Sequence, residues 1–333
     1  MAQRLYHQHL TAPVDMRSAV RDLCGVQAQF MSNAMHALRI RTVDFDEADA
    51  QQLIKSWTLR GTMHVFAPED LPLFLHENRT HFLRPCDTLE ADEHLTRERK
   101  RYFAECIVAA VASGVAEREA LKAVCFEKGM TEDEAQSVFN AWGGTIRALC
   151  EAGQLCHKVQ ERKAYRLCPP FEPMGENEAH QELVRRYFAH YGPATIRDAA
   201  YFFGAPQGQI RRWMETVPLA ERVIGGQTYF SGEIHTDVPD IPECIFLAGF
   251  DPLMLGYQKT ENPFLPPEHL RGIFNLAGIV MPAVLWRGRV IGRWKKTGRK
   301  LTITPFEALP QTETIRLHAL HQWPELTKIE VCL

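Results

Sequence analysis

The chain has 333 residues, of which 45% are hydrophobic and 24% are charged, and its formal net charge is −3. This length allows about two domains or three to four small modules, and the composition excludes disordered and fibrous proteins. No apolar run reaches the roughly 18 residues of a membrane helix, and Met1–Leu5 lacks the apolar core of a signal peptide. We therefore expect a cytoplasmic protein with no membrane partner, in which a local basic patch could still bind nucleic acid.

A pattern of short helices followed by a strand or a hairpin occurs three times along the chain. The first copy is the loosest of the three. Apolar spacing predicts its helices near 15–24, 32–39 and 46–57, and a strand over 58–66.

The second copy is the clearest. Helical spacing of apolar residues begins at Arg97, and Thr131 opens a capping box that starts a third helix. Trp142 falls among the apolar positions of that helix, so we expect it in the core. The predicted helices are 97–114, 117–128 and 131–153, and the predicted strands are 154–159 and 164–167.

The third copy repeats this order with helices over 179–191, 195–204 and 207–216 and a hairpin of strands 219–224 and 227–230. Three helices and a hairpin are the order of a winged helix, which usually binds duplex nucleic acid but also serves as a protein–protein module. On its third helix Trp213 is expected in the core, while Arg211 and Arg212 either contact phosphates or form a solvated face.

Two proline-rich breaks, at 168–173 and 238–242, separate the last parts of the chain, and the part beyond the second break is rich in strands. We therefore predict an α+β fold of three tandem winged-helix modules followed by a small C-terminal β-barrel-like domain. The predicted domains are 1–90, 91–170, 171–237 and 238–333.

A strongly basic segment, Trp286–Lys300, has seven basic residues in fifteen and no acidic one. Strand alternation would place basic side chains on one face, with Trp286 or Trp294 beside them, as in a hairpin that contacts DNA phosphates. The alternative is an edge strand whose charges prevent aggregation. The predicted DNA contacts are Arg287, Arg289, Arg293, Lys295, Lys296, Arg299 and Lys300.

Known metal and cofactor motifs are absent from the sequence. There is no Walker loop, dinucleotide fingerprint or nucleophile elbow. The two histidines of His76–His81 are five residues apart, about 140° around a helix, so they cannot share a metal on a helix. Cys150, Cys156, His157 and Cys168 fit no common zinc spacing. We expect no metal and no cofactor, and read His76–His81 as an exposed helix end.

Gln27 and Gln29 lie in a segment that we expect to be extended, because Gly25 is suited to end the preceding helix. In an extended segment residues i and i+2 point the same way, so the two amides would lie on one side. Taken alone, two glutamines near a helix end are usually surface residues.

Four segments in order resemble the AlkZ-type winged-helix DNA glycosylases: Gly25–Gln29, Trp57–His64, Gly249–Tyr257 and Gly288–Trp294. The resemblance spans nearly the whole chain. It implies three tandem winged helices that form a curved DNA-binding surface, a C-terminal β-barrel, and removal of alkylated purines from DNA. Some members of the family also unhook interstrand crosslinks.

The family's catalytic Gln-x-Gln or Gln-x-Asp signature maps onto Gln27 and Gln29. Many members carry an acidic residue and an arginine after the third motif, where this chain has Gln258 and Lys259, so the preferred lesion is in question. A purine alkylated at N7 or N3 is cationic, and its glycosidic bond is already weakened. Two amides that position water and stabilise the oxocarbenium ion therefore suffice. They would not suffice for a neutral base such as uracil, where a carboxylate would be needed.

Arg60 and His64 are expected in the strand of the second motif. Either they contact phosphate or the lesion near Gln27, or His64 packs inside the first module. No lysine is placed for Schiff-base chemistry, so we expect a monofunctional glycosylase that acts as a monomer on damaged double-stranded DNA. The alternatives are a non-catalytic winged-helix regulator, for which we find no heptad or sensor site, and a protein-interaction scaffold.

Overall fold

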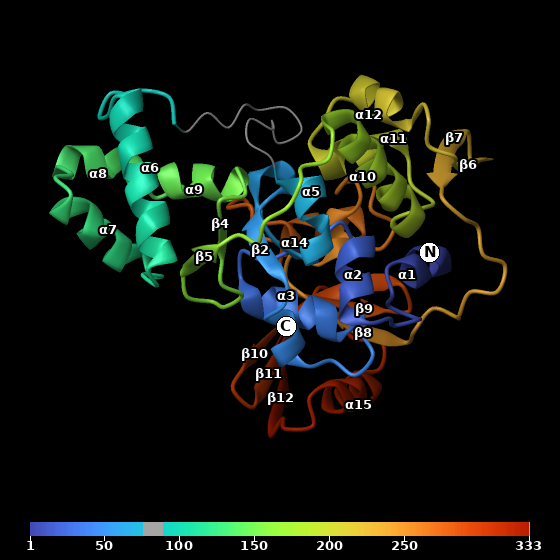
Figure 1. The fold of residues 1–333 in the computed structure, drawn as a ribbon. Helices are drawn as coiled ribbons and strands as arrows, with labels where there is room; N and C mark the ends of the chain where they lie inside the picture. The colour runs from blue at the N-terminus through green and yellow to red at the C-terminus, as the bar shows by residue number, and fades with distance from the viewer. Residues whose placement is uncertain (76–88, 333) are drawn as a thin grey trace. The chain divides into compact units, whose positions relative to one another are not determined.

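A computed structural model describes residues 1–75 and 89–332 as a mixed α+β fold (Figure 1). Chain contacts divide it into two units. Unit 1 contains Met1–Gln27, Ser32–Phe45 and Val184–Leu333, and unit 2 contains Ala28–Met31 and Asp46–Leu183. The His76–His81 segment lies outside the described residues. Within the described residues, no helix has the length and apolar character that crossing a membrane requires.

Unit 2 begins with a short helix, α4 (Glu47–Ala50), and a hairpin of β2 (Ile54–Trp57) and β3 (Met63–Phe66). The hairpin runs in register from Ile54 opposite Phe66 to Trp57 opposite Met63. The prediction of one helix over 46–57 is therefore wrong in its second half. The buried residues of β2 pair as a strand instead, since that pairing satisfies their backbone inside the sheet. The short helix η1 (Leu59–Gly61) lies between the two strands, and η2 (Pro68–Asp70) and α5 (Leu71–Phe74) follow β3.

The second set of helices in unit 2 is α6 (Arg97–Ala112), α7 (Arg118–Glu127), α8 (Glu132–Val138) and α9 (Gly144–Glu151). Thr131 forms the predicted capping box with Glu134. The single third helix that we predicted is, however, two helices. The chain breaks at 139–143, and the two glycines where α9 begins, Gly143 and Gly144, have φ of 117° and 54°. These are left-handed conformations that glycine adopts at little cost and that end an α-helix.

Strands β4 (Leu155–His157) and β5 (Tyr165–Leu167) form the hairpin that follows these helices. Lys55 of β2 pairs with His157 of β4, so the two hairpins share one sheet in the order β3-β2-β4-β5. The helices pack on a cluster of buried side chains that includes Phe103, Ile107 and Leu155. Strands from the first two predicted modules are thus combined in one sheet.

Unit 1 contains the N-terminal helices α1 (Ala2–His7) and α2 (Met16–Asp22), the short strand β1 (Val26–Gln27) and most of α3 (Met31–Arg39). The third predicted copy follows its expected order. Its elements are α10 (Glu176–His190), α11 (Ile196–Phe203), α12 (Gln207–Met214), β6 (Ala220–Ile224) and β7 (Gln227–Ser231). Trp213 is buried against the edge of Phe203, which confirms its predicted place in the core.

The C-terminal part of unit 1 is an open sheet with the order β12-β11-β10-β9-β8. Its outer strands, β8 and β12, do not pair with each other, so the predicted barrel-like closure is wrong. One face is covered by α15, whose Ile315 and Ala319 pack with Trp323 on the sheet's buried side chains, and this helix makes a two-layer core. The elements are β8 (Cys244–Leu247), α13 (Pro252–Leu255), η3 (Pro267–His269), α14 (Leu270–Ile273), β9 (Ala283–Trp286), β10 (Arg289–Thr297), β11 (Lys300–Pro305), α15 (Thr312–Gln322) and β12 (Lys328–Val331).

Candidate functional site

The Gln-x-Gln segment follows directly from the way α2 ends. Gly25 has a φ of 82°, and its N–H donates to the carbonyl of Val20 at 2.7 Å, which closes the helix. The chain then becomes extended in β1, as predicted from the sequence. Ala28, between the two glutamines, donates its N–H to the carbonyl of Met63 at 2.7 Å. The end of the segment is thereby fixed beside β3 within unit 2.

The two glutamines differ in exposure and belong to different units. Gln27 is 7% exposed and lies in unit 1, whereas Gln29 is exposed and lies in unit 2. Gln29 therefore offers its amide to solvent or to a ligand, while Gln27 is largely enclosed by protein. Their convergence on one reacting bond stays a prediction.

Arg60 lies in the turn between β2 and β3 rather than in a strand, with a φ of 57°. The turn is closed by the N–H of Thr58, which donates to the carbonyl of Thr62 at 3.0 Å. His64 is 3% exposed, and its Nδ1 lies 2.9 Å from the hydroxyl of Thr58 and 3.1 Å from the carbonyl of Thr62. These contacts favour the alternative in which His64 packs inside the hairpin and braces the turn that carries Arg60.

Lys55 is a residue that sequence reasoning missed. It is buried in β2, and its Nζ donates to the carbonyl of Gln160 at 2.7 Å. Burial lowers the pKa of Lys55 to about 8. A lowered pKa makes a lysine more nucleophilic. However, this ammonium is engaged by a backbone carbonyl and is only 6% exposed, so it does not present itself to a substrate.

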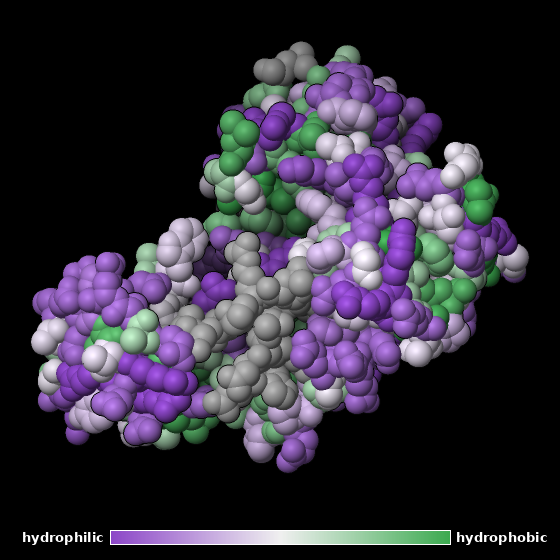
Figure 2. Space-filling view, turned by 90° about the horizontal axis from the view of Figure 1, so that it is seen from above, coloured by the Kyte–Doolittle hydropathy of each residue, from purple (hydrophilic) through white to green (hydrophobic). Residues whose placement is uncertain are grey.

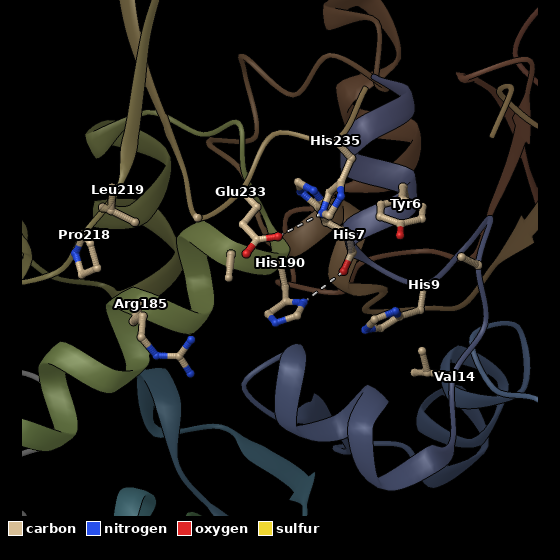
Figure 3. Close-up of a pocket in the computed structure, with 13 residues that line it drawn as sticks. Tyr6, His7, His9, Val14, Arg185, His190, Pro218, Leu219, Glu233 and His235 are labelled. Carbon is tan, nitrogen blue, oxygen red and sulfur yellow. Dashed lines mark hydrogen bonds and ion pairs between the residues drawn. The ribbon is translucent and has the colours of Figure 1, made fainter. Parts of the chain in front are cut away.

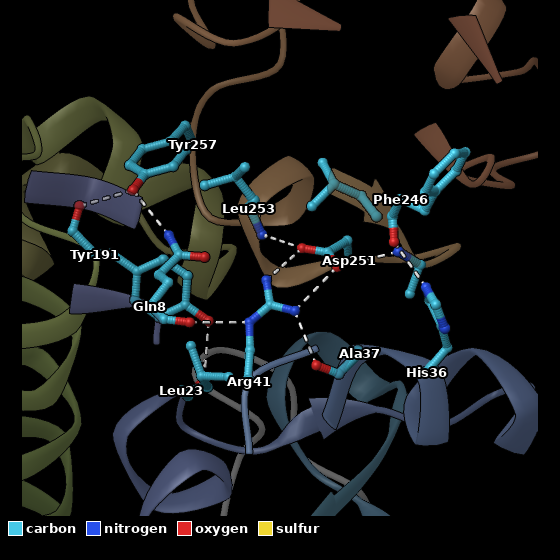
Figure 4. A network of polar contacts seen from close by, with 12 residues as sticks. Gln8, Leu23, His36, Ala37, Arg41, Tyr191, Phe246, Asp251, Leu253 and Tyr257 are labelled. Atoms are coloured by element: carbon cyan, nitrogen blue, oxygen red, sulfur yellow. Dashed lines mark hydrogen bonds and ion pairs between the residues drawn. The ribbon is translucent and has the colours of Figure 1, made fainter. Parts of the chain in front are cut away.

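A buried ion pair connects the N-terminal helices to the Gly249–Tyr257 motif within unit 1 (Figure 4). Arg41 and Asp251 are both fully buried, and Arg41 Nη2 lies 2.6 Å from Asp251 Oδ1. Arg41 also donates to the carbonyls of Gln8 and Ala37, and Asp251 caps α13 through the N–H of Leu253. Every charged atom of the pair has a partner, which is the condition for a buried pair to be tolerated.

The same motif reaches the helix that precedes Gln27. The hydroxyl of Tyr257 accepts from Gln8 and donates to the carbonyl of Tyr191, both at 2.9 Å. The hydroxyl of Tyr191 in turn donates to the carbonyl of Leu23 at 3.0 Å, at the end of α2. The third family-like motif is therefore a support for the Gln27 segment. Arg41 and Gln8, which complete this network, were not singled out in the sequence, because nothing in its local pattern marks a buried arginine.

The basic hairpin of β10 and β11 alternates as predicted, with Arg293 and Lys295 exposed on one face and Trp294 between them on the other. Trp286 and Trp294 both pack into the core of the sheet. Four basic side chains are paired with acids: Arg287 with Glu243, Arg289 with Glu268, Lys296 with Glu325 and Lys300 with Glu330.

The remaining basic residues of this hairpin differ in their contacts. Arg299 donates to the backbone carbonyl of Glu325. Arg293 and Lys295 have no acidic partner within 4 Å among the described residues, and the same holds for the exposed Arg211 and Arg212 on α12. Among the predicted DNA contacts, these four cations are the ones most readily available to phosphates.

A histidine-lined cavity of about 650 Å³ lies within unit 1 (Figure 3). Beside it, the carboxylate of Asp22 lies 2.8 Å from Nε2 of His9 and 3.3 Å from Nε2 of His190. Burial lowers the pKa of His190 to about 4, so this ring is neutral near pH 7. These are donor types that bind zinc. Here, however, His9 is hydrogen-bonded to the Asp22 carboxylate, and Nδ1 of His190 lies 3.4 Å from the carbonyl of His7. We therefore assign the cluster a structural role that links the ends of α1, α2 and α10.

Comparison with known proteins gives first the class and then the family. The sequence model described as "DNA glycosylase AlkZ-like" matches residues 20–327, and the chain is therefore a DNA glycosylase, which hydrolyses N-glycosyl bonds. It belongs to the AlkZ-like DNA glycosylase family, as its four motifs indicated. The regulator and scaffold alternatives are set aside by this assignment.

A protein sequence and a solved structure from Streptomyces sahachiroi illustrate the similarity. An "Interstrand DNA cross-link repair glycosylase" is 27% identical over an alignment 348 positions long, and this alignment covers 96% of this chain and 91% of that protein. The solved structure of the DNA glycosylase AlkZ has the same fold, with a TM-score of 0.78 and 23% identity, and the match covers 99% of this chain and 97% of that one.

Proposed function

We propose that this glycosylase removes cationic purines, alkylated at N7 or N3, from double-stranded DNA, and that its substrates include interstrand crosslinks. The observation that carries the proposal is the Gln-x-Gln segment, which holds two amides and no carboxylate. The similarity to a crosslink repair glycosylase over 96% of the chain supports the crosslink substrate. Gln258 and Lys259 depart from the family pattern, so the particular adduct can differ from that of relatives.

In the proposed reaction the bond between C1′ of the sugar and the purine nitrogen breaks, and its electron pair neutralises the cationic base. Water adds to C1′ and loses its proton to solvent. Gln27 and Gln29 accept hydrogen bonds from this water through their carbonyl oxygens and place partial negative charge near the oxocarbenium ion. Neither amide can act as a strong base, so only a leaving group that is already activated departs.

We further propose that the three sets of helices and hairpins are tandem winged-helix modules that bind DNA as a monomer in the cytoplasm. Arg60, Arg211, Arg212 and the basic hairpin supply the phosphate contacts. Exposed ion pairs contribute little to stability, so the paired cations of the hairpin can exchange an acid for a phosphate at small cost. His64 acts in this scheme by holding the turn that presents Arg60.

The test is base release from duplex DNA that contains N7-methylguanine, compared between wild type and the Gln27→Ala/Gln29→Ala variant. We expect release by wild type without strand cleavage, and a loss of at least about a hundredfold in the variant, since each amide acts on the transition state. A matched duplex containing uracil should remain intact with both proteins.

Gln311→Ala is the control, because it removes an exposed glutamine of unit 1 whose side chain accepts a local hydrogen bond from Thr314. A crosslinked duplex is the second substrate. If wild type released base from neither substrate while binding DNA normally, the proposed reaction would be wrong. If the double variant retained full activity, the assignment of the two glutamines would fail while the reaction stood.

A further inference from the structure

Trp142 is the most exposed tryptophan among the described residues, with 85% of its surface accessible. It lies in the break between α8 and α9, within unit 2, rather than in the core where helical spacing places it. A large aromatic side chain normally contributes to stability by being buried. Here the fold gains little from the indole, so its position calls for another explanation.

The loop that carries Trp142 is held in one conformation from several directions. The Oδ1 of Asn140 accepts the N–H of Trp142 at 2.9 Å and that of Gly144 at 3.1 Å. Arg118 donates to the backbone carbonyls of Phe139 and Asn140. Because the backbone on both sides is fixed by these bonds, the indole is presented to solvent from a preorganised loop.

One arginine connects this loop to the turn that carries Arg60. The side chain of Arg147 lies close to a glycine at each end. A Cβ atom added to Gly143 would be 2.6 Å from Cβ of Arg147, and a Cβ atom added to Gly61 would be 2.9 Å from Nη2 of Arg147. The guanidinium also lies 5.9 Å from the centre of the Trp57 ring and is held by Glu151 at 2.7 Å. A single side chain thus spans the distance between the Trp142 loop and the β2–β3 turn.

The same turn leads to the candidate catalytic segment. Two residues after Gly61, the carbonyl of Met63 accepts the N–H of Ala28, which is the neighbour of Gln29. All of these contacts lie within unit 2. Continuous contacts through Arg147 and β3 therefore connect the exposed indole to the residue next to Gln29.

We propose that Trp142 binds DNA by stacking its indole on the face of a nucleobase that is uncovered where the base stack is opened. The inference rests on the proposed function, because a base that leaves the duplex uncovers its neighbours and its partner. Aromatic side chains stack on any base and need no particular sequence, which suits an enzyme that recognises damage. Trp142 is then a positioning residue, and the chemistry stays with the glutamines.

The probe is a duplex with a tetrahydrofuran abasic-site analogue, compared with the fully paired duplex of the same sequence. We expect Trp142→Ala to weaken binding to the abasic duplex about tenfold and to leave binding to the paired duplex nearly unchanged. Trp142→Phe keeps an aromatic face and should retain most of the affinity. The tryptophan fluorescence of the Trp142→Phe variant should be quenched less than that of wild type when the abasic duplex is added.

The control is Leu276→Ala, which removes another highly exposed apolar side chain, 88% accessible, from unit 1. It should change neither affinity nor quenching. Equal affinity of wild type and Trp142→Ala for the abasic duplex would overturn the proposal. An equal loss of affinity for the abasic and the paired duplex would overturn it as well. None of these readouts needs base release. A failure of the proposed reaction would therefore leave DNA quenching of Trp142 intact, whereas a failure of this inference would leave base release intact.

Discussion

Arg41 and Asp251 are joined by a bidentate contact without access to water, with N–O distances of 2.6 and 3.1 Å. Taking two charges out of water is costly, and only the complete set of partners offsets that cost. Removing one member leaves the other buried and unpaired. The pair therefore stabilises the arrangement of its neighbours, including the end of α2 that precedes the Gln-x-Gln segment.

We expect Asp251→Ala to lower the free energy of unfolding by about 3–5 kcal/mol, because it strands the Arg41 guanidinium. Denaturant unfolding measures this change. Glu268→Ala is the matched control, since it breaks the exposed pair with Arg289 and should change stability little. Equal effects of the two substitutions would show that burial does not determine the strength of the Arg41 pair.

Helix α3 and strand β8 meet through His36, whose Nε2 lies 2.7 Å from the carbonyl of Phe246. The ring also stacks on Trp323, with 5.3 Å between ring centres. Burial lowers the pKa of His36 to about 4. In the unfolded chain this histidine takes up a proton below its ordinary pKa of about 6.5, whereas the folded protein resists until about pH 4.

Stability should therefore fall as the pH is lowered from about 6.5 toward 4, since the unfolded chain binds more protons across that interval. His36→Gln can still donate a hydrogen bond to Phe246 but does not titrate. We expect it to reduce the pH dependence of the unfolding free energy by up to about 1.4 kcal/mol per pH unit. His318→Gln, on the partly exposed side of α15, is the control. An unchanged slope in His36→Gln would contradict the assignment.

The elements show why the sequence predicted some features and missed others. The capping box at Thr131 and the stop at Gly25 depend on neighbouring residues, and the structure confirms both. The break at 139–143 depends on two glycines inside an otherwise helical pattern. Continuing the helical period across that break placed Trp142 in the core. Local pattern is sufficient where the stabilising contact is local.

Long-range pairing could not be predicted in the same way. The antiparallel pairing of Lys55 with His157, which joins two hairpins, and the parallel pairing of β12 with β11 connect residues far apart in the sequence. The partner of Asp251 is 210 residues away. At the candidate site, the glutamine motif, Arg60 and His64 were singled out from the sequence, but the turn between β2 and β3, Lys55 and Arg147 were not. Their importance lies in contacts that only the folded chain makes.

For the molecule as a whole, DNA binding has to arise from the distribution of charge rather than from its sum. The net charge is −3, and hydrophilic side chains dominate the face drawn in Figure 2. Four cations of the basic hairpin have acidic partners and Arg299 bonds to a backbone carbonyl, which leaves Arg293 and Lys295 as its two cations with neither kind of partner among the described residues. Phosphate binding by these two should release counterions and depend on salt.

We expect Arg293→Glu/Lys295→Glu to weaken binding to undamaged duplex DNA by about tenfold or more at low salt. It should also reduce the slope of log affinity against log salt by about two. Binding titrations at several salt concentrations measure both. Arg316→Glu on α15 is a control with the same change of charge per residue, at a site already paired with Glu313. If Arg316→Glu weakened DNA binding as much as the double substitution, the net charge of the protein rather than the cations of β10 would govern binding.

The chain passes between the two units four times, after Gln27, Met31, Phe45 and Leu183. The first two passages enclose only the four residues Ala28–Met31. No contiguous fragment therefore contains either unit complete on its own, and a cut designed to release unit 2 would separate Gln29 from Gln27. For the engineer, this enzyme cannot be divided into exchangeable halves. Exchanging one unit for that of a relative would also exchange one of the two glutamines of the Gln-x-Gln segment.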